Sequence, residues 1–323
     1  MSLRVAGGGV APPKLVLEPG PRFRWALLVA VVLFLSAATA LWYYIGIHKL
    51  HPPDFPFYGT WLQPLFMTVG TLFFLFVLRL TTGKRWRDIS ADGRFIIVSS
   101  IVLFSLMWWF GRSGFFYRNL AQYVPKSAFS PLYGFMYFSF GCFFFRTAVP
   151  LLLIKFRFRK KPSDFGYALK GGSDVWWVYF VLAAIVCLIV VFYASTLQQF
   201  QAKYPMCRRM IHDFEIPLWQ FLVYQGFYGM IFVSGESFWR GYISFGLRRD
   251  LGYMGLVFMI IPYTMAHFGK PWPETLGAML TGMVLGGLAL RHRSFWLGVA
   301  AHWGVALTMD LSAVWRLGIR ITY

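Results

Sequence analysis

Four ionisable side chains in the C-terminal third of the chain lie within or at the end of long apolar runs. Glu236 and Arg240 stand four residues apart in the run Ser234–Gly241, and His267 and His302 follow in later runs. Positions i and i+4 share one face of a helix, so the carboxylate and the guanidinium can pair there. An ionisable side chain inside a membrane span is costly enough to indicate function. A carboxylate, a cation and two imidazoles together are typical of a hydrolytic site.

The composition of the chain indicates that these residues belong to a membrane protein. Of its 323 residues, 58% are hydrophobic and only 13% are charged, far from an average soluble domain. Apolar runs that approach the roughly 20 residues needed to cross a bilayer predict an all-α, polytopic membrane helix bundle with about nine transmembrane helices. The expected spans are Trp25–Ile47, Phe57–Leu80, Phe95–Trp109 (the shortest), Pro131–Ile154, Val175–Ser195, Pro217–Leu247, Leu251–Phe268, Thr275–Leu290 and Ser294–Leu317.

The formal net charge of +19 is distributed as membrane topology requires. Basic residues precede the first expected span and follow every second one: Arg4, Lys14, Arg22 and Arg24, then Lys84, Arg85 and Arg87, then Lys155, Arg157, Arg159, Lys160 and Lys161, then Arg248 and Arg249, then Arg291 and Arg293. By the positive-inside rule, these connections and the N-terminus are cytoplasmic, and the C-terminus is outside. The connection that carries Arg112, Arg118 and Lys126 fits this pattern less well. Because the charge borders spans, we expect no nucleic-acid partner.

The chain divides into three expected regions. Residues 1–24 are predicted to be a disordered cytoplasmic tail, residues 25–215 to be N-terminal transmembrane helices, and residues 216–323 to be the catalytic core helices. The first span is expected to be a retained anchor, because its apolar run is longer than that of a signal peptide. Three scattered cysteines are too few to predict a disulfide framework.

The order of the motifs resembles that of the CPBP family of intramembrane proteases, named for CAAX prenyl proteases and bacteriocin-processing proteins. Glu236 and Arg240 form the pattern Glu-x-x-x-Arg, Tyr263 and His267 form an aromatic-x-x-x-His pattern, and a basic turn precedes the segment that ends in His302. The resemblance covers about residues 223–310. It implies an integral, multi-pass membrane protease, and we expect this one in the inner membrane of a prokaryotic cell.

Two positions depart from the family pattern, which is Glu-Glu-x-x-x-Arg, Phe-x-x-x-His and His-x-x-x-Asn. Gly235 stands where the family has its first Glu, and Ala306 stands where it has Asn. The resemblance implies that the first Glu activates water while the His residues and the Asn assist. With Gly235 in that place, Glu236 would have to take the role of base itself.

The chemistry that this set of residues could support is peptide hydrolysis in a polar cavity that admits water between the spans. Arg240 would hold Glu236 ionised and in one rotamer, so that the carboxylate could take a proton from water. His267 could share the proton transfer, and His302 could donate to the carbonyl oxygen as negative charge develops. The expected substrate is a membrane-associated protein, or a leader or sorting peptide, presented from the lipid bilayer.

Three alternatives remain open at this stage. Glu236, His267 and His302 have the composition of a catalytic zinc site with one position left for water, although no cofactor is the favoured prediction. The chain could also be a catalytically inactive scaffold or immunity protein that keeps the fold of the family. A transporter that relays protons is the third, but it would more often show repeats and broken helices in matched halves.

Overall fold

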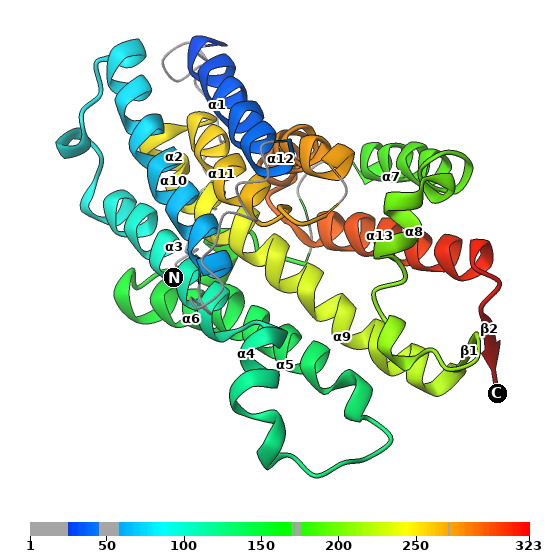
Figure 1. Cartoon of the computed structure of the whole chain (residues 1–323). Coiled ribbons are helices and arrows are strands. Elements are labelled where there is room, and N and C mark those ends of the chain that lie inside the picture. Colours follow the sequence, from blue (N-terminus) through cyan, green and yellow to red (C-terminus); the bar gives the residue numbers. More distant parts are fainter. Residues whose placement is uncertain (1–24, 45–57, 170, 172–175, 271) are drawn as a thin grey trace, which may run out of the picture.

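The computed structural model describes residues 25–44, 58–169, 171, 176–270 and 272–323, without the side chains of residues 58–63. The expected tail of residues 1–24 lies outside the described residues. The described chain is almost wholly helical, so the predicted all-α membrane bundle is confirmed (Figure 1). Its α-helices are α1 (Trp25–Tyr43), α2 (Tyr58–Thr82), α3 (Ala91–Phe110), α4 (Ser113–Asn119), α5 (Tyr133–Phe143), α6 (Val149–Leu152), α7 (Trp176–Phe192), α8 (Gln198–Lys203), α9 (Leu218–Glu236), α10 (Gly246–Leu251), α11 (Met254–Met265), α12 (Trp272–His292) and α13 (Trp296–Arg316).

Seven helical stretches of the described chain are long and apolar enough to cross a membrane, so the expected count of nine is not confirmed. They are Trp25–Tyr43, Pro64–Thr82, Ala91–Phe110, Ser130–Arg157, Trp176–Thr196, Trp272–His292 and Trp296–Arg316. The expected span Leu251–Phe268 corresponds to α11, which has only 12 residues. The expected span Pro217–Leu247 is helical, but it is not among the seven.

The third span is longer than its apolar run predicts. The run Phe95–Trp109 suggested a short span, whereas α3 has 20 residues. The helix begins earlier because the Ser90 side chain caps it by accepting a hydrogen bond from the Gly93 amide. Asp92 in the first turn suits the positive end of the helix dipole, although it interrupts the apolar pattern.

The sixth expected span forms a single helical rod whose geometry changes at the candidate site. Helix α9 ends at Glu236, and a π-helical segment, Ser237–Phe245, leads on into α10. Within that segment the Ser244 hydroxyl donates to the carbonyl of Trp239, five residues back. All nine residues of the π-helical segment are buried. Such wide turns are often found at functional sites, because they redirect side chains within a continuous helix.

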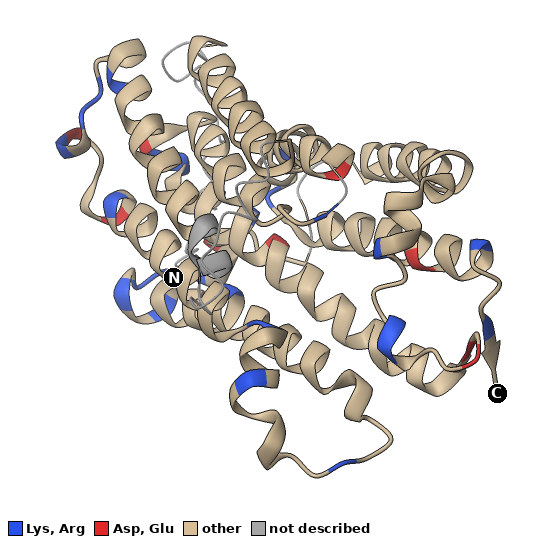
Figure 2. Ribbon diagram, viewed as in Figure 1, with Lys and Arg blue, Asp and Glu red and all other residues tan. Residues whose placement is uncertain are grey.

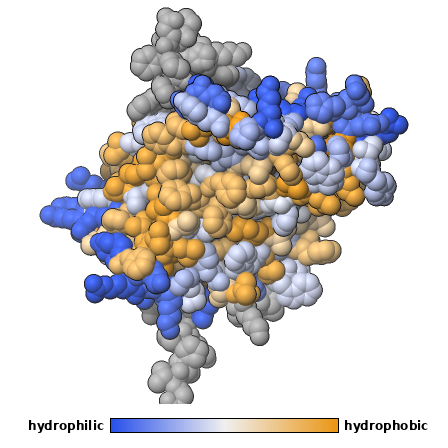
Figure 3. All heavy atoms as spheres, turned by 90° about the horizontal axis from the view of Figure 1, so that it is seen from below, coloured by the Kyte–Doolittle hydropathy of each residue, from blue (hydrophilic) through white to orange (hydrophobic). Residues whose placement is uncertain are grey.

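Helices from both expected transmembrane regions pack together in one bundle. Helix α7 lies along α13, α5 lies along α9, and α11 contacts both α2 and α12 (Figure 1). The division at residue 215 therefore stays a prediction. The outer surface is apolar: Phe180, Leu188 and Phe192 of α7 are all more than half exposed. Figure 3 shows such a hydrophobic face with hydrophilic patches at its borders, as expected of a surface that contacts lipid.

A short strand pair joins two distant parts of the chain, which the sequence did not predict. Strand β1 (Glu215–Pro217) pairs in parallel with β2 (Arg320–Thr322), so the C-terminal segment is fastened to the start of α9. An ion pair between Arg320 and Glu215 adds to this connection. Runs of three residues carry too little alternation to reveal a strand in the sequence.

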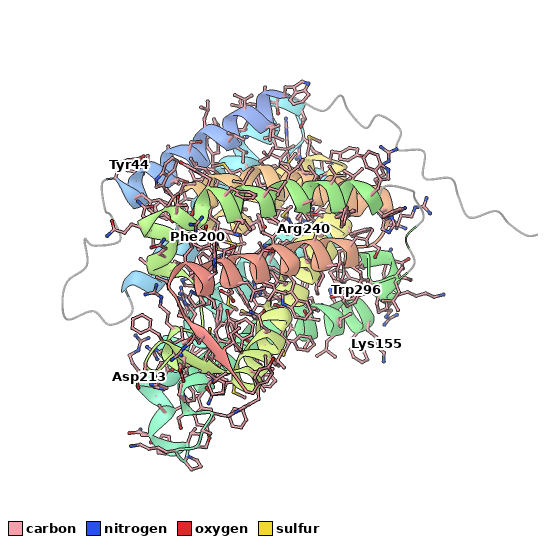
Figure 4. All side chains as sticks on the ribbon, turned by 90° about the vertical axis from the view of Figure 1, so that its right-hand side faces the viewer. Tyr44, Lys155, Phe200, Asp213, Arg240 and Trp296 are labelled. Atoms are coloured by element: carbon pink, nitrogen blue, oxygen red, sulfur yellow. The ribbon has the colours of Figure 1, made fainter. Side chains whose placement is uncertain are left out.

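The bundle has two ends of different character. Figure 4 shows Tyr44 and Asp213 at one end, Lys155 and Trp296 at the other, and Arg240 between them. We call these the Tyr44 end and the Lys155 end. Figure 2 shows basic residues around the connection of α2 to α3 and at the end of the fourth span. These two places lie together near Lys155, since Arg157 pairs with Asp92 at the start of α3. This end contains most of the basic connections predicted to be cytoplasmic.

Candidate active site

Glu236 lies at the centre of a buried charged cluster inside the bundle. Its Oε1 atom is 2.9 Å from Nη1 of Arg240 and 3.1 Å from Nδ1 of His302. The Glu236 and Arg240 side chains are 1% and 0% exposed, whereas the His302 side chain is 26% exposed. The structure thus brings together three of the four predicted site residues, although 66 residues separate Glu236 from His302.

Two elements position this cluster. Glu236 and Arg240 are four residues apart across the junction of α9 and the π-helical segment, which allows them to pair. Helix α13 can approach closely because it has Gly298 at the contact: a Cβ atom there would lie only 2.9 Å from Oε2 of Glu236. His302 follows one turn later on the same face, and its ring packs against Phe232 at a centroid distance of 4.8 Å.

His267 connects to this cluster through Tyr263. Its Nδ1 atom is 2.8 Å from the carbonyl oxygen of Tyr263, one turn earlier. The Tyr263 ring in turn lies beneath the guanidinium of Arg240, 4.4 Å from the ring centroid. The aromatic-x-x-x-His motif therefore builds a bridge between the second imidazole and the buried cation.

The hydrogen bonds of both imidazoles determine which nitrogen is free. A carbonyl oxygen only accepts, so Nδ1 of His267 must carry the proton. Nδ1 of His302 likewise donates to the carboxylate of Glu236. In the neutral form of each ring, Nε2 is then the unprotonated nitrogen and can act as a base.

A cavity of about 210 Å³, which we call the inner cavity, lies beside the cluster. His267, His302 and Gly235 line it, whereas Glu236 is not among its lining residues and contacts His302. The role of Glu236 as base stays a prediction. In this arrangement the carboxylate connects to the cavity through the imidazole of His302. At Gly235 a side chain would fit, because a Cβ atom there would be 3.7 Å from the nearest atom, Nε1 of Trp239.

An open recess of about 520 Å³, which we call the outer recess, leads toward the inner cavity from the Tyr44 end. The two spaces share Lys203, Gly269 and Lys270 in their walls. The Tyr43 hydroxyl donates to the carbonyl of Lys270 and fixes this wall to the end of α1. A polar path of this kind can admit water to a site inside a membrane protein.

Arg146 is a buried cation that the sequence analysis did not select. It lies in the π-helical segment Phe144–Ala148 of the fourth span, is 6% exposed and lines the inner cavity. Its Nε and Nη2 atoms have no hydrogen-bond partner within the described structure. The signal was present in the sequence: Arg146 is the one charged residue of the expected span Pro131–Ile154.

The positions near the end of α13 are structural. Asp310 accepts hydrogen bonds from the Tyr224 hydroxyl at 2.6 Å and from the Gln225 side chain at 3.0 Å. The backbone amide of Met206 donates to its other oxygen at 3.1 Å. Ala306 is buried in an apolar cluster that includes Tyr224. The carboxylate is thus committed to joining α9, α13 and the loop after α8, and it does not contact His302.

The alternative zinc set does not assemble in the described part of the structure. No group of three or more His, Cys, Asp or Glu side chains is arranged there to hold a metal ion. Glu236 and His302 are in direct contact, while His267 is hydrogen-bonded to a backbone carbonyl. We therefore derive no catalytic step through a metal.

A family of known proteases matches the part of the chain that contains the candidate site. Residues 215–308 match the family described as type II CAAX prenyl endopeptidase Rce1-like. The chain is thus similar in this region to the CAAX prenyl proteases. The match runs from β1 through most of α13 and includes all four predicted site residues, so the resemblance found in the sequence is confirmed. Neither the curated proteins nor the solved structures gave a match to the chain.

Proposed function

We propose that this CAAX-type protein is an intramembrane endopeptidase that hydrolyses a peptide bond of a membrane-associated protein, or of a leader or sorting peptide. One observation carries the proposal: the 3.1 Å contact between His302 and Glu236 orients an imidazole on the wall of the inner cavity. Similarity to the protease family supports the reaction class. We place the protein in the inner membrane of a prokaryotic cell, with its N-terminus in the cytoplasm.

In the proposed reaction His302 is the group that moves the proton. Its Nε2 atom takes a proton from a water molecule as the oxygen bonds to the peptide carbonyl carbon. When the carbon–nitrogen bond breaks, the imidazolium returns that proton to the leaving amine. Glu236 holds the imidazole in the required tautomer and stabilises its positive charge, as a carboxylate does in other catalytic pairs. Arg240 holds Glu236.

His267 has a second role in this scheme. Its Nε2 atom is available to accept a hydrogen bond from the same water and so to orient it toward the carbonyl. These roles differ from the hypothesis based on sequence, in which Glu236 itself is the base. The reason is burial: the Glu236 side chain is 1% exposed and does not line the inner cavity, whereas His302 does.

The experiment compares membrane-protein termini between cells that lack the protein and three strains that express the wild type, Glu236→Gln or Glu215→Gln. Glu215→Gln is the matched control, because it removes a carboxylate at the protein surface within the same family region. New termini are expected with the wild type and the control, and they should be absent with Glu236→Gln at equal protein level. Identical termini in all three strains would rule out a role for Glu236. The absence of any new terminus with the wild type would favour the inactive scaffold instead.

A further inference from the structure

The inner cavity is lined by cations from four separate elements. Arg112 lies between α3 and α4, Arg146 in the fourth span, Lys203 at the end of α8 and Lys270 just before α12. None of the residues that line the cavity is an Asp or a Glu. A concave site lined by charge of one sign attracts the opposite charge. Burial, and to a smaller extent the nearby charge of Lys270, lowers the pKa of Lys203.

Three of these cations already have partners in the described structure. Lys270 pairs with Glu274 at 2.5 Å, and the guanidinium of Arg112 stacks over the Trp108 ring at 4.4 Å. The ammonium of Lys203 donates to a backbone carbonyl at 3.5 Å. These three side chains contribute positive electrostatic potential to the cavity, but their existing contacts already satisfy them, so they do not indicate a bound ligand.

Arg146 is different, because part of its guanidinium has nothing to bind. Nε and Nη2 lack a hydrogen-bond partner in the described structure. Nε and Nη2 lie on one edge of the guanidinium, and that edge forms the two parallel hydrogen bonds of an Arg–carboxylate pair. A buried cation with both donors of this edge free is a strong indication of an absent anion.

We propose that the inner cavity is a carboxylate-binding subsite in which Arg146 holds a carboxylate of the peptide substrate beside His302. The proposal rests on the proposed peptidase function, because the ligand is part of the same substrate. At about 210 Å³ the cavity is smaller than the roughly 300–1,000 Å³ of pockets for drug-sized ligands, so it fits a chain end or one side chain. The carboxylate can come from either source, the C-terminus or an acidic side chain.

Gly235 also supports this assignment. It lines the same cavity, and its missing side chain leaves room for a group from outside. The outer recess provides the approach, since it shares Lys203 and Lys270 with the inner cavity. A peptide carboxylate would thus move along a path of positive charge from the recess to Arg146.

Binding can be measured without cleavage, on the full-length protein in phosphatidylcholine vesicles. The probes are the acetylated tripeptide Leu-Ala-Leu with a free C-terminus, the same peptide as an amide, the amide of Leu-Glu-Leu, and inorganic phosphate. The fluorescence of Trp108 and Trp239, which line the cavity, reports binding. At least one carboxylate peptide should bind about tenfold or more tightly than the neutral amide, a difference of about 1.4 kcal/mol. The free acid and the Glu peptide distinguish the two sources.

Arg146→Gln should abolish the preference for the carboxylate, and Arg146→Lys should reduce it, since lysine keeps the charge but lacks the fork. Arg157→Gln is the matched control: it removes an exposed cation from the end of the same span and should bind like the wild type. Equal affinity for acid and amide, an unchanged preference in Arg146→Gln, or tighter binding of phosphate than of both carboxylate peptides would overturn the proposal.

Two further variants keep the test independent of folding and of catalysis. Gly235→Glu adds a carboxylate to the cavity wall and should exclude the carboxylate peptides while raising the melting temperature above that of Gly235→Gln. If both variants bind the free acid alike, the subsite is wrong. If the wild type prefers carboxylate peptides over the amide but cleaves no substrate, the proposed peptidase function is wrong and the carboxylate-binding subsite is still supported.

Discussion

At the scale of single residues, the two oxygens of Glu236 have unequal surroundings. Oε1 receives both Arg240 and His302, whereas Oε2 faces Gly298 and has no hydrogen-bond partner in the described structure. The negative charge of the Glu236 carboxylate is therefore balanced by contacts to one of its two oxygens only. A buried charge that loses its partner is much more destabilising than a buried pair that is replaced as a whole.

Replacing Arg240 by Met should for this reason lower the free energy of unfolding by about 3–5 kcal/mol. The measurement is equilibrium unfolding of the purified protein in detergent micelles. The double variant Glu236→Leu/Arg240→Met removes both charges and should recover much of the loss. A double variant as unstable as Arg240→Met alone would show that the charge pair is not the cause.

The residues of the charged cluster could be found in the sequence because each is an ionisable group in an apolar setting. Arg146 gives the same signal, but no motif surrounds it, and its importance follows only from its free guanidinium edge. The cationic cavity could not be predicted at all. Its walls join Arg112, Lys203 and Lys270, which lie in connections and short helices without any common pattern.

At the scale of elements, the contact between α13 and the end of α9 determines whether Glu236 and His302 can meet. Gly298 and Gly304 both lie in α13, but they differ in surroundings. A Cβ atom at position 298 would clash with the Glu236 carboxylate at 2.9 Å, whereas one at position 304 would meet nothing within 4 Å. Gly298 is thus required because α13 approaches the Glu236 carboxylate closely there, whereas Gly304 has no such neighbour.

Gly298→Ala should accordingly displace the Glu236 carboxylate and lower cleavage at least about tenfold, since a shift of about 1 Å at a catalytic group can cost more than this. Gly304→Ala should keep full activity and leave stability equal or higher, by up to about 1 kcal/mol, because alanine favours the helix. Activity and melting temperature are measured on both variants. Equal activity of the two would refute the proposed contact.

The sequence predicted most helices but not their internal geometry. Apolar runs identify where spans lie, yet they miss a polar first turn such as that of α3, which its Ser90 cap determines. The π-helical turns at Arg146 and Arg240 could not be predicted, because the sequence pattern of a helix is read with the α-helical period of 3.6 residues and does not reveal a local change to wider turns. The pairing of β1 with β2 depends on backbone hydrogen bonds between segments about one hundred residues apart.

At the scale of the whole molecule, the two ends of the bundle face opposite sides of the membrane. Most basic connections gather at the Lys155 end (Figure 2), and from the positive-inside rule we infer that this end lies in the cytoplasm. The outer recess lies at the other end, beside Tyr44 and Gln199. We infer that the substrate enters from the non-cytoplasmic side.

Cysteine labelling in intact cells checks this orientation. In a variant with Cys142, Cys187 and Cys207 replaced by Ala, Gln199→Cys should react with a membrane-impermeant maleimide, because the recess is open outside. Lys161→Cys is the control at the Lys155 end and should react only after the cells are permeabilised. The reverse pattern would place the recess in the cytoplasm.

The central claim is that Glu236 acts on the substrate through His302, and a double-mutant cycle on cleavage rate tests it most directly. The purified wild type, Glu236→Gln, His302→Gln and the double variant are compared on one substrate peptide identified from the cellular termini. Residues that act as a unit give strongly non-additive effects. Each single variant should lose roughly two to four orders of magnitude, and the double variant should lose no more than the worse single one. Losses that multiply, or a single variant with full activity, would contradict the paired mechanism.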